Sequence, residues 1–571
     1  MHWSGDGPGM RFASVLLGVT VLSSAAGCTS HDAAKVRVDH STAAPVAALA
    51  DTGPVPGAVT ESWHVDLPFG SMTKPEPPRL VNGQLVVASS RGLDVFDAST
   101  GKERWHYREP GRGFGGYAAT AGVLVAMTYQ QDDPENEPLR RRVGLDAGTG
   151  RVLWTSRDKG IPFTTGVFSD VVAGGGVLPM KKVEYGDDLF GVDARSGHTR
   201  WTRDNVGGRG CETSELPTQG TDGSLLLFKV TCHGRDRILA LDPATGRKRW
   251  RKNLAPSSGE DVLGTSVSGG TALIQYETGY RIVAADGREP AGSGGIECYL
   301  ECRLQTTAGH IVVVPMDGGL GVSAKRHVLI VDTRTGRTTV GDIGEAYSTL
   351  TAAGGRVYGL HRHLFTTYVA RLLPSGLDVI DPATGAVQAR PLPFATSVTD
   401  DEPGEPAADW MAVAGGRLYT RRVLDETARV TAYATTKPGG PAGLGGVRAA
   451  DWPDACHLAP GFKADVHPSA VDRTATIGST TLRNAGCIVG DGITIVGVAW
   501  VAVSPEQAHA LLTMPATARK AHVDGADEAY SVSDSDDLWI RVGRYVIRVN
   551  DLHAKRRIRV ASAVAKELRR R

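Results

Sequence analysis

Six aspartates recur along this chain in one short frame, Asp-x-x-(Thr or Ser)-Gly. A carboxylate can act as a general acid or base, so these residues are the first candidates for chemistry. A turn explains them better, because glycine accepts a positive φ and the Asp and Thr oxygens can accept backbone N–H bonds inside a turn. We therefore interpret each aspartate as structural. The frames begin and end at Asp97 and Gly101, Asp146 and Gly150, Asp193 and Gly197, Asp242 and Gly246, Asp332 and Gly336, and Asp381 and Gly385.

A tryptophan follows each of the first four aspartates by eight places. An indole at that spacing falls on the strand after the turn, and its large flat surface is expected to be buried between neighbouring sheets. The last two frames keep the turn and lose the aromatic residue. The four tryptophans are Trp105, Trp154, Trp201 and Trp250.

Three other groups of residues could bind a metal. His361 and His363 would lie on one face of a strand, but no third ligand is near, so we interpret them as solvent-facing. Cys298-Tyr-Leu-Glu-Cys302 would also need two further ligands, which favours a disulfide. The acidic run from Asp534 to Asp537 lacks the Gly and the distal Glu of a calcium loop, and predicts a solvated turn. We predict no metal site.

The spacing of the frames predicts the architecture. Successive aspartates are separated by 49, 47, 49, 90 and 49 residues, so a degenerate unit is expected inside the gap of 90, at residues 266–287. Each unit also contains an earlier glycine hairpin, which makes four strands in about 47 residues, as in a propeller blade. We predict a mainly β protein with an eight-bladed propeller. Seven blades are the alternative, if the weak fifth or eighth unit is an insertion.

A propeller needs a closing strand. The segment Glu61–Leu67, with Trp63, looks like the outer strand of a unit whose other strands are missing from that part of the chain. The eighth unit, near Tyr433, lacks such an outer strand. We expect the N-terminal segment to supply it.

The repeats resemble the pyrroloquinoline-quinone (PQQ)-type propeller family, whose signature Ala-x-Asp-x-x-Thr-Gly-x-x-x-Trp is matched by Ala240–Trp250. The resemblance covers residues 58–448 and implies the fold. The family includes quinone-dependent dehydrogenases and propellers that bind only protein partners, such as the lipoprotein of outer-membrane assembly machinery.

A dehydrogenase of this family would need a calcium site of Glu, Asn and Asp and a Trp under the quinone, and its alcohol-oxidising members carry adjacent bonded cysteines. No two cysteines are adjacent here, and the repeat tryptophans are assigned to the frame. The candidate amides lie in no recognisable site motif. We predict no catalytic or cofactor-binding residue. The amides are Asn82, Asn136, Asn205 and Asn253.

The N-terminus is typical of an exported protein. An apolar run, Phe12–Leu22, follows Arg11 and leads to Ala25-Ala-Gly-Cys28, which resembles a bacterial lipobox with Ala in place of Leu. Residues 1–28 are therefore predicted to be a lipoprotein signal peptide with Cys28 lipidated; a plain secretory peptide is the alternative. Residues 29–57, rich in Ala, Pro, Ser and Thr, are predicted to be a flexible tether.

The remaining cysteines number six, which permits three disulfides. Proximity in the repeat frame favours the pairs Cys211–Cys232, Cys298–Cys302 and Cys456–Cys487.

Residues 449–571 contain no repeat frame and are predicted to form a small α+β domain. A strand at Ile493–Val503 leads into a helix capped by Ser504, with Pro505 at its first position. A second strand is expected at Leu538–Val549, and a second helix at Leu552–Arg571. The region resembles small lipoprotein and sensor-type domains of high-GC Gram-positive bacteria. The expected inner face of the last helix is Ile558, Ala561, Val564 and Leu568.

Charge limits the partners. The chain has 63 basic and 62 acidic residues, a balance that argues against bulk nucleic-acid binding. We expect a lipoprotein anchored to the outer face of the cytoplasmic membrane, whose propeller is a non-catalytic scaffold for a protein or cell-envelope partner. One alternative is an oxidoreductase that uses PQQ and calcium. The other is an envelope sensor whose C-terminal domain reads a ligand.

Overall fold

The computed structural model describes most of residues 38–571. The predicted signal peptide with Cys28 lies outside the described residues. The gaps within 38–571 are 46, 54–58, 69–76, 90, 121, 131–140, 158–159, 163, 166–169, 172–174, 183–187, 217, 254–261, 277–278, 291–301, 316–325, 344–346, 362–372, 397–407, 425–426, 436–446, 466–474, 478–479, 483, 491–493, 513–517 and 533–535.

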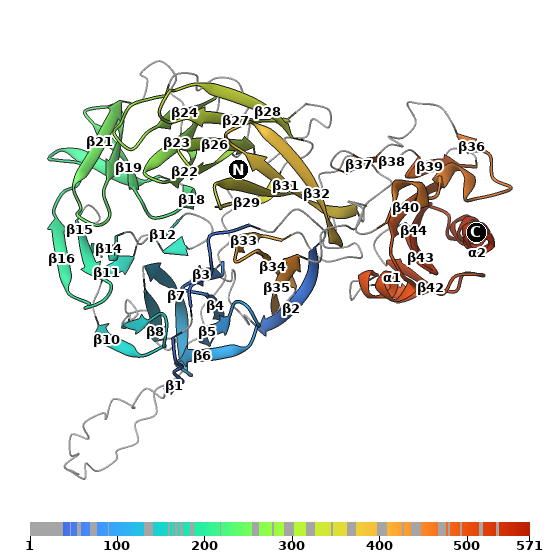
Figure 1. The fold of residues 1–571 in the computed structure, drawn as a ribbon, viewed down its shortest axis with the longest axis horizontal. Coiled ribbons are helices and arrows are strands. Elements are labelled where there is room, and N and C mark those ends of the chain that lie inside the picture. Colours follow the sequence, from blue (N-terminus) through green and yellow to red (C-terminus); the bar gives the residue numbers. More distant parts are fainter. Residues whose placement is uncertain are drawn as a thin grey trace, which may run out of the picture. The chain divides into compact units, whose positions relative to one another are not determined.

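Most of the chain is β-structure, arranged as small sheets in chain order (Figure 1). We number the first eight sheets by the unit that forms them. Sheet 1 contains β3 (Arg79–Val81), β4 (Gln84–Ser89), β5 (Gly92–Asp97) and β6 (Glu103–Arg108), with β1 (Asp39–His40) at its edge. Sheet 2 contains β7 (Arg112–Thr120), β8 (Val123–Gln130), β9 (Arg141–Asp146) and β10 (Val152–Arg157). Sheet 3 contains β11 (Gly160–Pro162), β14 (Val177–Lys182), β15 (Leu189–Asp193) and β16 (Thr199–Arg203). The strands β12 (Thr164–Thr165) and β13 (Asp170–Val171), which lie between β11 and β14 in the chain, form a separate two-stranded sheet.

The next five sheets follow the same plan. Sheet 4 contains β17 (Cys211–Glu215), β19 (Leu226–Cys232), β20 (Arg235–Leu241) and β21 (Lys248–Asn253); sheet 5 contains β22 (Val262–Ser268), β23 (Thr271–Tyr276) and β24 (Gly279–Val283), with β18 (Thr218–Thr221). Sheet 6 contains β25 (Cys302–Thr307), β26 (His310–Pro315), β27 (Arg326–Asp332) and β28 (Thr338–Ile343). Sheet 7 contains β29 (Tyr347–Ala353), β30 (Arg356–His361), β31 (Leu373–Asp381) and β32 (Ala386–Thr396), and sheet 8 contains β33 (Trp410–Ala414), β34 (Arg417–Leu424), β35 (Thr427–Thr435) and β2 (Val59–Pro68).

Each sheet shares a buried apolar core with the next, and sheet 8 shares one with sheet 1. Successive residues of a strand point to opposite faces, so neighbours such as Leu124 and Val125 belong to different cores. The eight contacts form a closed cycle. One pair from each core is Val95 with Leu124, Val125 with Leu178, Leu189 with Phe228, Ile238 with Ile274, Leu273 with Val313, Val312 with Val357, Leu360 with Leu418, and Tyr419 with Leu85.

The closing strand comes from the N-terminal segment, as predicted. Strand β2 pairs antiparallel with β35, from Val59 opposite Thr435 to Pro68 opposite Thr427 (Figure 1). The guanidinium of Arg429 donates to both oxygens of Asp66, at 2.7 and 2.9 Å. The last sheet is therefore completed by residues that precede the first.

The degenerate fifth unit lies where the sequence placed it. Its segment forms three strands among the described residues, and the fourth member of the sheet is β18, which pairs parallel with β22. Strand β18 belongs in sequence to sheet 4, so one chain segment joins the two sheets. Residues 291–301, where a fourth local strand would follow the turn at Gly287, lie outside the described residues, so the prediction of four local strands is not tested in this unit.

The predicted tether also needs correction. Strand β1 pairs with β6, and the following residues make hydrogen bonds to the turns of several sheets. The described residues of 41–53 are therefore bound to the sheets and do not form a free coil; we call this segment the N-terminal strap. Its composition resembled a linker because its contacts come from the backbone. Residues 29–37 lie outside the described part of the chain.

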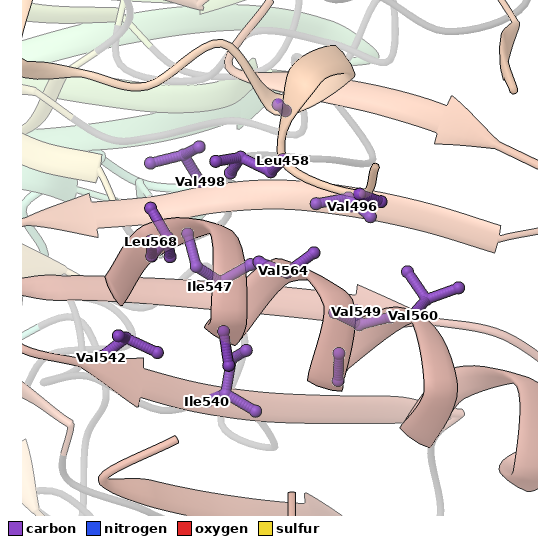
Figure 2. Packing of buried hydrophobic residues seen from close by; sticks show 14 of the residues in the cluster. Leu458, Val496, Val498, Ile540, Val542, Ile547, Val549, Val560, Val564 and Leu568 are labelled. Carbon is purple, nitrogen blue, oxygen red and sulfur yellow. The ribbon is translucent and has the colours of Figure 1, made fainter. Parts of the chain in front are cut away.

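A second sheet forms in the C-terminal region. Its strand order is β36–β39–β40–β44–β43–β42–β41, and the long helix α2 covers it through Val560, Val564 and Leu568 (Figure 2). The strands are β36 (Ala464–Asp465), β39 (Gly486–Val489), β40 (Thr494–Val501), β41 (Ala518–Lys520), β42 (Glu528–Val532), β43 (Asp537–Val542) and β44 (Tyr545–Asn550). The helices are α1 (Pro505–Leu511) and α2 (Ala554–Arg570), with short turns η2 (Ala449–Asp451) and η3 (Ala455–His457), and β37 (Ala475–Ile477) pairs with β38 (Thr480–Leu482).

Two expectations for this region are wrong. Residues 538–549 are not one strand but the hairpin of β43 and β44, which turns at Gly543, where φ is +55°. Ile558 is 42 % exposed and does not belong to the inner face of α2. The Ser504 cap is confirmed, since its hydroxyl accepts the Gln507 N–H at 3.2 Å. No helix in the described part of the chain is long and apolar enough to cross a membrane.

Candidate functional site

The repeated aspartates all lie in the same turn. In each of the six frames the glycine N–H donates to the aspartate carbonyl at 2.8 Å, and the aspartate carboxylate accepts backbone N–H groups inside the turn. At Asp332, for example, the N–H groups of Thr335 and Arg334 lie 2.9 and 2.8 Å from Oδ1. These donors hold the pKa of Asp332 below its ordinary value. A general base near neutral pH needs the opposite shift, so Asp332 serves as an anchor of its turn, and the other five aspartates accept the same kind of backbone hydrogen bonds.

The tryptophans link each unit to the next. A methyl group built at the turn glycine of one unit would overlap the indole of the preceding unit. It would lie 2.6 Å from Trp105 at Gly150, and 2.6 Å from Trp154 at Gly197. Trp63 stands in the same relation to Gly101, which places the closing strand in the repeat pattern. The indole therefore packs directly on the glycine, and any larger residue at the glycine position would displace the indole.

A buried ionic cluster surrounds Glu109 between sheets 1 and 2, at the end of the sheets opposite to the Asp-x-x-x-Gly turns. Glu109 is 2 % exposed, and its carboxylate accepts hydrogen bonds from the Tyr107 and Thr128 hydroxyls. Arg112 Nε and Arg141 Nη1 lie 3.2 and 3.1 Å from its oxygens. Burial, and then the bond to Glu109, raises the pKa of Tyr107 well above its ordinary value. Four donors occupy this carboxylate, so the cluster fastens two sheets together.

Sequence reasoning missed this cluster because its members come from separate strands and share no motif. The only signal was an acidic residue, Glu109, directly after the outer strand of the first unit. That position gives no indication of which arginines approach it.

The amides considered for a cofactor site do not come together. Asn82 has φ +48° in the turn between β3 and β4, Asn205 has φ +50° after β16, and Asn253 ends β21. Asn136 lies outside the described residues. Within the described part of the chain, no three His, Cys, Asp or Glu side chains are grouped as a metal site would require.

The histidine and acidic candidates are only partly covered. His361 ends β30 and His363 lies outside the described residues, so their pairing is not tested. Asp537 is not in a solvated turn: it is 3 % exposed and forms an ion pair with Arg548, whose Nε and Nη2 lie 2.8 and 3.0 Å away. This carboxylate also serves packing.

Two of the three predicted disulfides are confirmed. Cys211 bonds to Cys232 across β17 and β19, and Cys456 bonds to Cys487 in the C-terminal region. Cys302 is disulfide-bonded, whereas its predicted partner Cys298 lies outside the described residues.

The two ends of the sheets differ in how much they vary. At one end, which we call the turn end, lie the glycine hairpins and the Asp-x-x-x-Gly turns. These turns are short, but residues 163–176 and 216–225 separate the first two strands of sheets 3 and 4. At the opposite end, the loop end, the second and third strands of a sheet are joined by as little as residues 277–278 and by as much as 131–140, 316–325 or 362–372. The connection between the second and third strands therefore varies in length from unit to unit, whereas the Asp-x-x-x-Gly turn does not.

The N-terminal strap lies on the turn end. Its carbonyls and side chains meet the turns of four sheets: Ala43 N–H donates to Thr149, Gly415 and Gly416 donate to Ala50 and Thr52, and Gly354 donates to Asp51 Oδ1, at 2.8 to 3.0 Å. The carbonyl of Ala47 lies against Gly83. The strap thus runs from sheet 2 over sheets 1 and 8 to sheet 7, across the place where the first and last sheets meet.

Comparison with known proteins fits this geometry. A family model described as outer membrane protein assembly factor BamB matches residues 56–222. Among curated proteins no relative matches the chain.

Solved structures match this chain at low identity. The designed protein Ika8 is 14 % identical, with 63 % of this chain and 97 % of that chain covered and a TM-score of 0.38. The quinohemoprotein alcohol dehydrogenase ADHIIG of Pseudomonas putida HK5 is 12 % identical (70 % and 80 % covered, TM-score 0.35), and apo AztD of Citrobacter koseri is 14 % identical (62 % and 95 % covered, TM-score 0.36). We draw no functional conclusion from similarities of this size. The family match and the six repeated turns, which the structure carries in a closed cycle of sheets, make this chain a PQQ-like repeat β-propeller.

Proposed function

We propose that this chain is an exported lipoprotein, held to the outer face of the cytoplasmic membrane through Cys28, and that its propeller is a non-catalytic binding scaffold. In this proposal the eight sheets are eight blades, and residues 449–571 are a small α+β domain beside them. The partner is a protein or a component of the cell envelope.

The observation that carries the proposal is the difference between the two ends of the sheets. The turn end carries the repeated Asp-x-x-x-Gly turns, and the protein's own N-terminal strap lies on it. The loop end collects the connections that differ from unit to unit, which is where a rigid scaffold presents binding residues. We therefore place the partner at the loop end.

The buried charges support a scaffold. Glu109, Asp537 and Asp551 are each buried and each bound by at least one arginine. Carboxylates that are satisfied in this way fix packing and have little capacity left for proton transfer.

The strap changes the expected distance from the membrane. Strand β1 begins at Asp39, so only residues 29–38 would separate a lipidated Cys28 from the first sheet. Ten residues reach at most about 35 Å, whereas a tether to residue 57 would reach about 100 Å. The propeller would be held close to the bilayer.

Site-specific photo-crosslinking on intact cells tests the binding end. A photoreactive residue is placed at the exposed loop-end positions Arg91 and His233, and as matched controls at the exposed turn-end positions Arg195 and Thr335. We expect one partner to be captured from the loop-end positions only, as identified by mass spectrometry. Capture of the same partner from the turn end would refute the placement.

Two further measurements test the anchor and the chemistry. Cys28→Ser is expected to move the protein from the membrane fraction to the soluble fraction; a protein that stays in the membrane fraction would contradict lipid anchoring. Addition of PQQ with calcium is expected to leave the melting temperature unchanged. A rise in melting temperature at saturating cofactor would favour the dehydrogenase alternative.

A further inference from the structure

Helix α2 places a line of cations on its outer face. Its inner face packs on the C-terminal sheet through Val560, Val564 and Leu568, so the opposite face is turned to solvent (Figure 2). Residues three, four or seven places apart share a face of a helix, and four exposed cations follow that spacing. They are Lys555, Arg559, Lys566 and Arg570.

Charge is strongly segregated in this part of the molecule. Residues 551–571 contain eight Lys or Arg and two Asp or Glu, a formal charge of +6, in a chain whose net charge is +1. The remainder of the protein is therefore net acidic. A local excess of this size raises the positive potential over one face.

Two of these cations lie near the N-terminus of α2, and no described side chain neutralises them. Positive charge is unfavourable near the N-terminus of a helix, and α2 has no acidic residue in its first turn. Arg556 and Arg557 are explained, because they pair with Asp551 and Asp536. Lys555 and Arg559 have no ion-pair partner among the described residues and remain exposed. No ion pair among the described residues explains why cations occupy these two positions.

Two large apolar side chains lie beside these cations. Leu552 is 71 % exposed and Ile558 is 42 % exposed. Ile558 and Arg559 lie one helical turn after Lys555, and Leu552 lies two residues before α2 begins, so all four residues belong to the first turns of the helix and the segment that leads into it. Cations next to exposed aliphatic groups are typical of segments that lie at a membrane interface, where the charge meets lipid phosphate and the apolar group enters the acyl boundary.

We propose that this surface, formed by Leu552, Lys555, Ile558 and Arg559 and extended along α2 by Lys566 and Arg570, binds an anionic phospholipid membrane. Charge complementarity selects the anionic headgroup, and the apolar pair favours a bilayer over a soluble polyanion. The contact is peripheral and reversible, because two aliphatic side chains and a few cations bind weakly one by one. It is independent of Cys28 and of the loop-end partner.

Vesicle co-sedimentation tests the proposal with the full chain carrying Cys28→Ser, so that no lipid anchor contributes. The probes are phosphatidylcholine vesicles, the same vesicles containing phosphatidylglycerol, and the second set again at high salt. The test variant is Lys555→Gln with Arg559→Gln. The matched control is Arg247→Gln with Lys248→Gln, which removes two exposed cations without a described ion pair from the turn after Asp242.

We expect binding to the phosphatidylglycerol vesicles, little binding to phosphatidylcholine, and weaker binding at high salt. Each cation near an anionic bilayer contributes about 5-fold to affinity, so the test variant should bind about 30-fold more weakly while the control is unchanged. A second variant, Leu552→Ser with Ile558→Ser, should weaken the binding that persists at high salt. Circular dichroism verifies that each variant is folded.

The other outcomes overturn the proposal. Equal losses in test and control would mean that overall charge, and not this surface, attracts the vesicles. Absence of binding to anionic vesicles, or binding to a soluble polyanion but not to vesicles, would exclude a membrane as the partner of α2. None of these results bears on whether Cys28 is lipidated.

Discussion

The glycine of the repeated turn offers a test of how the sheets are held together. Gly150 has φ +77°, and a methyl group there would lie 2.6 Å from Cδ2 of Trp105, which is fully buried. Gly336 has the same backbone conformation, with φ +71°, but no described atom lies within 4 Å, because the preceding unit has no tryptophan. The two positions therefore differ in the indole contact and not in the turn.

The expected costs follow from this difference. Alanine in a left-handed conformation costs about 1–2 kcal/mol, and Gly336→Ala should lose that amount. Gly150→Ala carries the same backbone cost and an overpacking cost of about 1–3 kcal/mol, since Trp105 must shift and strain its 3.0 Å bond to Gln84 Oε1. We expect total losses of about 2–5 kcal/mol at Gly150.

Urea unfolding followed by circular dichroism measures both variants. In a Trp105→Ala background, Gly150→Ala should cost only the backbone part, so the two substitutions should show a coupling of about 1–3 kcal/mol. If Gly150→Ala and Gly336→Ala lose the same free energy, or if the coupling is absent, the indole does not hold the units in register and the reasoning fails.

Three further predictions follow from the buried polar groups and the disulfide. Glu109→Gln should lower the free energy of unfolding by about 3 kcal/mol in urea, because it removes the charge of a buried carboxylate that pairs with two partly buried arginines. A loss below about 1 kcal/mol would show that these arginines find another partner. Replacing both Cys456 and Cys487 by Ser should lower the free energy of unfolding by about 3–4 kcal/mol relative to the oxidised parent, because the disulfide closes a loop with a sequence separation of 31 and so restricts the unfolded chain. A reduced parent as stable as the oxidised one would contradict this. Burial raises the pKa of Asp551, but the hydrogen bonds that it accepts from Arg556 and other donors lower this pKa overall. The ionised Asp551 therefore stabilises the fold above the ordinary aspartate pKa of about 3.9, and this stabilisation is lost as pH falls through the folded pKa. The stability difference between the parent and Asp551→Asn should therefore narrow on acidification, and a difference that is constant from neutral to acid pH would count against this assignment.

The parts of the fold that sequence predicted are those with local causes. The six turns need one glycine and one carboxylate within five residues, and the structure shows the same hydrogen bonds in each. The role of β2 was also visible, because Trp63 marks an outer strand with no unit of its own, and a closed cycle of sheets has one place for it.

The parts that were missed depend on contacts between distant segments. The N-terminal strap binds through backbone groups, which any sequence offers, and the partners of Glu109 come from four separate strands. The hairpin of β43 and β44 is different, since its signal was present: Gly543 and Arg544 interrupt an alternation that otherwise runs through both strands. The alternation of apolar and polar residues alone could not distinguish two strands joined by a two-residue turn from one long strand.

The pairing of β2 with β35 has a consequence for how the protein reaches its native state. Asp66 and Arg429 are 363 residues apart in the chain, so a ribosome must synthesise nearly the whole propeller before β2 meets its partner. Contacts of such high order are slow to form, and until they do, a strand edge stays available to other chains. A chaperone that holds residues 59–68 during this interval would act at the most vulnerable step of biogenesis.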